Sequence, residues 1–173
     1  MLVVTSKIEN STRGEDRAVV RLDRDRLLVV VADGAGGTSA GAAAAEAVCD
    51  AVLKEPAVST EGWTDLLREI DLALSRSRTG GLSTAVVVEV HGWTLWGASV
   101  GDSAAWLVRH SEVVDLTERQ QRKPLIGSGD SKPTPFGPVP LDGRLLVASD
   151  GLFKYVRRAE IQQFVSAPPQ FTK

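Results

Sequence analysis

Hydrophobic residues along the chain follow first the period of strands, then that of helices, then that of strands again. Two short apolar runs, at residues 18–22 and 26–32, flank a three-residue polar turn, which is typical of a β-hairpin. An alanine-rich segment at residues 40–53 predicts a helix, because alanine has the highest helix propensity. Residues 61–77 predict a second helix, since their apolar side chains recur every three or four positions.

The second half of the chain alternates as strands do. Five strands are predicted, at residues 85–90, 94–99, 104–109, 113–116 and 144–149, before a closing helix at 157–166. Residues 117–143 are rich in glycine, proline and charge without a clear period, so we expect a long surface loop that is functional or mobile. This order of elements predicts one α+β domain over residues 1–173.

Two aspartates, Asp33 and Asp150, each end an apolar run and are each followed at once by glycine. Taken singly, either aspartate is equally explained as a turn former or a helix cap. Two carboxylates brought together repel, and one takes up a proton unless a cation neutralises them. Oxygen ligands suit Mg²⁺ or Mn²⁺. The pair therefore predicts a metal-dependent enzyme.

Composition narrows the class of protein. The hydrophobic share of 43% and the charged share of 24% are ordinary for a globular protein. A net charge of −2 gives no electrostatic reason to expect nucleic acid or an anionic membrane as a partner. The single Cys49 excludes an internal disulfide and fits a reducing compartment, and no apolar run reaches membrane-spanning length. We expect a cytoplasmic protein.

Acidic and glycine-rich segments recur along the chain in a fixed order. They are Glu15-Asp16, Asp33-Gly34-Ala35-Gly36-Gly37, Ser83-Thr84-Ala85, Gly101-Asp102-Ser103 and Ser149-Asp150-Gly151-Leu152. In this order and spacing they resemble the metal-dependent serine/threonine protein phosphatases of the type 2C (PPM) family, over about residues 15–165. Ala35 stands where eukaryotic members often have histidine, so the chain is more similar to the bacterial members. One Asp-Gly is a weak signal, but the whole series is a strong one.

The resemblance implies a four-layer α-β-β-α sandwich of two antiparallel sheets flanked by helices, with the metal site at one end. The family continues beyond the last helix to a further acidic ligand and a final strand. The sequence stops at Lys173, so we expect the last strand to be missing.

The resemblance also implies two Mn²⁺ or Mg²⁺ ions, with a weaker third. The implied metal ligands are Glu15, Asp16, Asp33, Gly34 through its carbonyl, Asp102 and Asp150. Asp33 would bridge the two ions, Asp150 would serve the second ion, and Asp102 together with Asp150 would hold the third. A water made acidic by the two ions would attack the phosphoester in line.

This mechanism implies dephosphorylation of phosphoserine and phosphothreonine in proteins, a signalling reaction that reverses a serine/threonine kinase. Asp33 and Asp150 are the expected catalytic residues. The family's phosphate-binding arginine lies upstream of the Glu-Asp pair; Ser11 occupies the counted position, so the nearby Arg13 is the candidate. Arg119, Arg122 and Lys123 form a charge run that could meet a phosphopeptide, although such a run is usually just solvated.

Two other readings stay open. The alternative to an active phosphatase is a truncated or non-catalytic phosphatase-like domain that binds a phosphoprotein or another partner. It is favoured because no later acid completes the Asp150 ion and Glu160 is a poor substitute, whereas the retained acidic residues argue against it. The glycines at 34–37 before a helix also resemble a dinucleotide-binding turn. In that reading Asp33 would repel a pyrophosphate, and the first helix leads to another helix rather than to a parallel strand.

Overall fold

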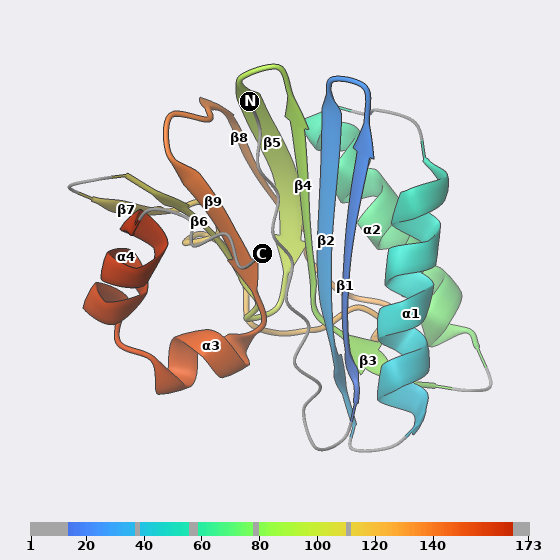
Figure 1. The fold of residues 1–173 in the computed structure, drawn as a ribbon. Coiled ribbons are helices and arrows are strands. Elements are labelled where there is room, and N and C mark those ends of the chain that lie inside the picture. Colours follow the sequence, from blue (N-terminus) through green and yellow to red (C-terminus); the bar gives the residue numbers. More distant parts are fainter. Residues whose placement is uncertain (1–13, 37–38, 56–58, 78–79, 110–111, 168–173) are drawn as a thin grey trace, which may run out of the picture.

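The protein folds into four layers in a computed structural model that describes residues 14–36, 39–55, 59–77, 80–109 and 112–167. Helices α1 and α2 cover one face of the larger sheet, the smaller sheet packs on its other face, and α3 and α4 cover the smaller sheet (Figure 1). The predicted sandwich of two antiparallel sheets flanked by helices is confirmed.

The elements have the following bounds. They are β1 (Asp16–Asp23), β2 (Arg26–Ala35), α1 (Ser39–Lys54), α2 (Thr60–Ser75), β3 (Leu82–Ser83), β4 (Ala85–His91), β5 (Thr94–Val100), β6 (Ala104–Val108), β7 (Val113–Asp115), β8 (Thr134–Pro140), β9 (Arg144–Ala148), α3 (Asp150–Tyr155) and α4 (Arg158–Ser166). The larger sheet has the order β1-β2-β4-β5-β8, with β3 paired to β2, and the smaller sheet has the order β7-β6-β9. No helix of the described segments is long and apolar enough to cross a membrane.

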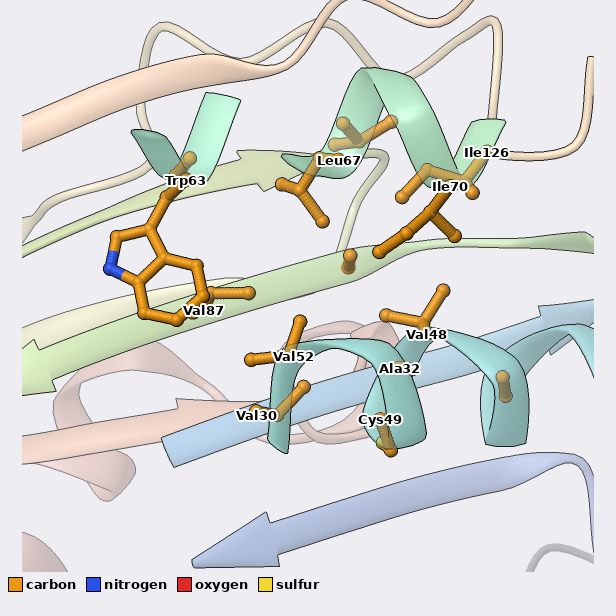
Figure 2. Close-up of a cluster of buried hydrophobic side chains, with 14 of the residues drawn as sticks. Val30, Ala32, Val48, Cys49, Val52, Trp63, Leu67, Ile70, Val87 and Ile126 are labelled. Carbon is orange, nitrogen blue, oxygen red and sulfur yellow. The ribbon is translucent and has the colours of Figure 1, made fainter. Parts of the chain in front are cut away.

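Strand alternation divides the interior into three apolar cores. In β2, Leu28 and Val30 belong to the core under the helices α1 and α2, which also contains Trp63. Figure 2 shows Val30 in this core beside Val52 of α1. Leu27, on the opposite face of the strand, packs toward the smaller sheet. A third core, which includes Trp106, lies between the smaller sheet and the helices α3 and α4. Four layers require three such contacts, and the period-two pattern of the strands supplies them.

The segment 117–143, predicted as a loop without regular structure, contains a strand. β8 pairs with β5 at the edge of the larger sheet. Its sequence TPFGPVP includes three prolines, and proline has a low strand propensity, so the sequence does not predict a strand here. Proline is nevertheless tolerated at a sheet edge, where its missing N–H removes no hydrogen bond between strands. The rest of the segment also packs, since Ile126 is completely buried. The loop prediction is therefore wrong for this part.

Two boundaries near the predicted site also differ. β2 continues to Ala35, so Asp33 lies within the strand rather than in a turn after it. The strand extends because its last two residues pair with β3, a two-residue strand too short to predict from the sequence. The six-residue helix α3 begins at Asp150 and was missed because so short a helix shows no period.

A buried carboxylate joins the larger sheet to α2. Glu89 of β4 is fully buried and accepts hydrogen bonds from Arg26 Nε at 2.9 Å and Trp63 Nε1 at 3.0 Å. The side chain of Arg26 is only 11% exposed. Removing one partner of such a pair leaves the other charge buried without compensation.

Glu89→Ala should lower the free energy of unfolding by about 3–5 kcal/mol. The exposed Glu69→Ala on α2 is the matched control and should change it by less than about 0.5 kcal/mol. Urea denaturation of both variants measures the difference, and equal stabilities would contradict this account of Glu89.

Candidate metal centre

The pairing register of β1 and β2 brings two carboxylates side by side. Asp16 lies opposite Asp33 in the antiparallel ladder. Ser149, just before α3, lies close by, and its hydroxyl donates to Asp16 Oδ2 at 3.3 Å. The end of β9 and the start of α3 therefore meet the β1–β2 ladder at one end of the sandwich.

Hydroxyl groups hold the backbone of Asp33 in place. The Asp33 N–H donates to Thr84 Oγ1 at 2.9 Å, and the Thr84 N–H donates to the Asp33 carbonyl at 2.9 Å. Thr84 Oγ1 also lies 2.7 Å from Ser103 Oγ, next to Asp102 in the chain. Thr84 and Ser103 are both buried, so one short network supports the positions of two candidate ligands.

The pKa of Asp33 reflects the nearby negative charges of Asp16, Asp102 and Asp150. The pKa of Asp33 rises from 3.8 to about 7, first because the carboxyl is partly buried. A hydrogen bond with Asp16 and the negative charges of Asp16, Asp150 and Asp102 raise the pKa further. The structure thus brings together four of the aspartates that the sequence singled out.

Three of these aspartates, Asp33, Asp102 and Asp150, border a cavity of about 650 Å³. Its lining consists of Asp33, Ala35, Leu82, Thr84, Asp102, Lys123, Pro124, Leu125, Ser128 and Asp150. The three carboxylates come from separate segments of the chain, and Lys123, Pro124, Leu125 and Ser128 belong to a further segment of the lining. An anionic group that enters this cavity meets carboxylates unless a cation neutralises them first.

Glu15 precedes Asp16, and its backbone carbonyl accepts a hydrogen bond from the Gly34 N–H at 3.3 Å, but Glu15 does not line the cavity. It is 8% exposed, and its Oε1 faces the backbone of Gly41 in α1, where an added Cβ would stand 2.9 Å from it. Within the described residues Oε1 has no hydrogen-bond partner. Gly34 has a packing reason to be glycine, because a Cβ there would lie 2.3 Å from the Gly41 carbonyl oxygen.

Two basic side chains already contact the carboxylates. Lys154 Nζ forms an ion pair with Asp150 across one turn of α3, and Arg122 lies 4.0 Å from Asp102. Among the residues that the structure describes, no group of three or more histidine, cysteine, aspartate or glutamate side chains is assembled closely enough to hold a metal ion. The donors are present in one region, but they are not drawn into a closed ligand cage.

The donor chemistry nevertheless fits a hard divalent cation. All the candidate side-chain donors are carboxylate oxygens, the ligands that Mg²⁺ and Mn²⁺ prefer. Two observations mark an excess of negative charge: the raised pKa of Asp33 and the unpartnered buried oxygen of Glu15. A cation would relieve both conditions.

Some site residues were missed or cannot be placed. Arg13, the candidate phosphate-binding residue, lies outside the described residues. The supporting role of Thr84 was missed, because a hydroxyl that holds the backbone of a distant strand leaves no local signal. Lys123 lines the cavity, which favours the substrate-facing interpretation of its charge run over the solvated one. The assignment of ligand roles stays a prediction.

Comparison with protein-family models shows which family the chain belongs to. The model of the family described as Stage II sporulation protein E (SpoIIE) matches residues 23–164, most of the chain. The chain belongs to the SpoIIE family. No curated protein matches its sequence.

Solved structures share the fold. A bacterial serine phosphatase is 21% identical with a TM-score of 0.79, over 95% of this chain and 81% of that one. The serine/threonine phosphatase Stp1 from Staphylococcus aureus is 21% identical with a TM-score of 0.78, over 94% and 81%. The catalytic domain of the phosphatase PstP, solved with two manganese ions, is 20% identical with a TM-score of 0.68, over 95% and 81%. The predicted resemblance to bacterial type 2C phosphatases is confirmed.

The raised pKa of Asp33 predicts a pH-dependent stability in the presence of a metal chelator. Between pH about 4 and about 7 the folded chain keeps a proton on Asp33 that the unfolded chain has released, so rising pH destabilises the fold across this window. Asp33→Asn should remove the part of this pH-dependent loss of stability that comes from Asp33. Its stability relative to the parent should therefore increase from about pH 4 to about pH 7 and then level off.

Urea denaturation at about pH 4.5, 6 and 8 measures this difference. Asp50→Asn, at an exposed position of α1, is the matched control and should follow the parent at each pH. A constant difference between Asp33→Asn and the parent would show that Asp33 titrates normally.

Proposed function

We propose that this protein is a metal-dependent phosphatase that removes phosphate from phosphoserine and phosphothreonine in proteins. The observation that carries the proposal is the gathering of Asp16, Asp33, Asp102 and Asp150 in one region, where the last three border a cavity and where burial and the neighbouring carboxylates raise the pKa of Asp33 to about 7. Family membership and the shared fold of bacterial serine/threonine phosphatases support it.

The side chains of the site have separable tasks in this proposal. When bound, two Mn²⁺ or Mg²⁺ ions supply Lewis-acid activation of water and neutralise the charge of the phosphoryl group. Asp33 would be shared between the ions, with Asp16 on one side and Asp150 on the other. Asp102 would serve a more weakly held ion. The carbonyl of Gly34 and the buried Glu15 carboxylate are further oxygen donors on the Asp16 side.

The remaining residues of the site hold and enclose these donors. Thr84 fixes the backbone of Asp33, and the hydroxyl of Ser149 donates to Asp16. Leu82 and Leu125 give the cavity apolar surface, which limits the number of water molecules around a reacting phosphoester.

A second candidate function is a phosphatase-like domain that binds a phosphoprotein without turnover. The specific observation that favours it is the pairing of Lys154 with Asp150 and of Arg122 with Asp102, which partly neutralises the acidic region without a metal ion. The opposing kinase and the cytoplasmic location stay predictions from the sequence.

Hydrolysis of p-nitrophenyl phosphate over a Mn²⁺ titration tests the proposed function. The parent chain should show metal-dependent turnover, and Asp33→Asn and Asp150→Asn should each lower it at least about a hundred-fold, because first-sphere ligands matter more than their outer partners. Saturation should need a high metal concentration, since a metal ion must displace Lys154 from Asp150.

The exposed Asp50→Asn is again the matched control and should retain parental turnover. Thermal unfolding of all variants separates loss of activity from loss of fold. A folded parent that binds phosphopeptides but never hydrolyses them would favour the second candidate. Parental turnover in Asp33→Asn would refute the metal assignment.

A further inference from the structure

The cavity has two sides of different chemistry. Asp33, Asp102 and Asp150 form an acidic side. A second part of the lining comes from one segment and consists of Lys123, Pro124, Leu125 and Ser128. We call residues 123–131 the cavity wall. Lys123 is the one basic residue among the described residues that line the cavity.

The ammonium group of Lys123 is available to a ligand. Within the described part of the chain it lies within 4.0 Å of no carboxylate oxygen, although three aspartates border the same cavity. Its neighbours differ in this respect, because Arg122 approaches Asp102 and Lys154 pairs with Asp150. An exposed cation that faces a cavity without an internal partner is suited to bind an anion that enters.

The backbone on both sides of Lys123 is held in place. Before it, the carbonyl of Gln121 accepts a hydrogen bond from the Gly101 N–H at 3.2 Å. After it, Ile126 and Ser83 exchange two backbone hydrogen bonds, of 2.9 and 3.0 Å. Ile126 is completely buried. Lys123 therefore projects from a short span between two fixed points.

A buried carboxylate on α2 holds the rest of the wall. Asp71 is 2% exposed. Its Oδ1 accepts hydrogen bonds from the Gly127 N–H at 2.7 Å and the Gly129 N–H at 2.9 Å, and its Oδ2 accepts from the Ser131 N–H at 2.8 Å. Three bonds from one charged acceptor are strong and directional. They fix the wall to the helix layer, in addition to its bridge to Ser83 at the sheet end that carries Asp33.

We propose that the cavity wall recognises the substrate: Lys123 binds an anionic oxygen of the phosphorylated protein, and Asp71 is the positioning residue that holds the wall. This inference rests on the proposed phosphoprotein substrate. The oxygen belongs either to the phosphoryl group or to an acidic side chain beside it in the substrate. Both present the same chemistry to an ammonium group.

Lys123→Gln tests the contact in two assays. The first measures kinetics with p-nitrophenyl phosphate and with phosphoserine peptides that have acidic or neutral flanking residues. The second measures the affinity for the same peptides by fluorescence anisotropy, which needs no turnover. We expect KM and Kd to rise about five-fold, the size of one exposed ion pair, with kcat unchanged. Lys123→Arg should restore parental values.

The exposed Lys132→Gln, on the same segment but outside the cavity lining, is the matched control and should change neither constant. A rise with every substrate assigns the contact to the phosphoryl group. A rise only with acidic flanking residues assigns it to the substrate side chain. Unchanged KM and Kd for all of them would overturn the role of Lys123, even where parental metal-dependent turnover upholds the proposed function.

Asp71→Asn tests the positioning role. It should raise KM and Kd about as much as Lys123→Gln does and leave kcat unchanged. The double variant should be little weaker than either single one, because both changes remove the same contact. Asp65→Asn, exposed on the same helix, is the matched control.

Additive effects of the Asp71 and Lys123 changes, or an Asp71→Asn variant with parental KM and Kd, would overturn the positioning role. If Asp71→Asn does not fold, Asp71→Glu is the second variant, because it keeps the charge and moves it by one methylene group. The same comparison with Lys123→Gln then decides the role.

Discussion

The antiparallel register of β1 and β2 is the constraint on which the rest of the structure depends. It sets Asp16 opposite Asp33 and, through the two-residue period, directs alternate side chains of β2 into different cores. A slip of one residue would turn the apolar residues of β2 to the wrong cores and separate the two carboxylates. Burial of Leu28, Val30 and their neighbours therefore stabilises, in the same register, an unfavourable pairing of like charges.

The unfavourable pairing of Asp16 and Asp33 bears on function. A domain without need of a cation would gain stability by replacing one carboxylate, since the raised pKa of Asp33 reports a destabilised charged form. The fold instead supports this residue with backbone hydrogen bonds to Thr84. Strain held in place by surrounding structure is typical of functional sites, and here it favours cation binding over a purely structural role for the aspartates.

Most of the architecture and the acidic group could be predicted from the sequence, because strand and helix periods and the order of the Asp-Gly motifs are local signals. β8 could not, since its prolines are unfavourable for a strand and only its place at a sheet edge makes them acceptable. The role of Asp71 was also hidden. Its partners at residues 127–131 are distant in sequence, and on α2 it resembles any polar helix position.

The two sides of the cavity are held by largely different contacts. The acidic side depends on sheet register and strand ends, where a small shift separates the carboxylates from one another. The wall depends on a side chain of α2 and on one short bridge to Ser83. In the proposed role of the wall, Asp71 would act on substrate binding through contacts that do not include Asp33. The two sides meet at Ser83, which exchanges backbone hydrogen bonds with Ile126 of the wall and donates its hydroxyl to the Asp33 carbonyl at 3.2 Å.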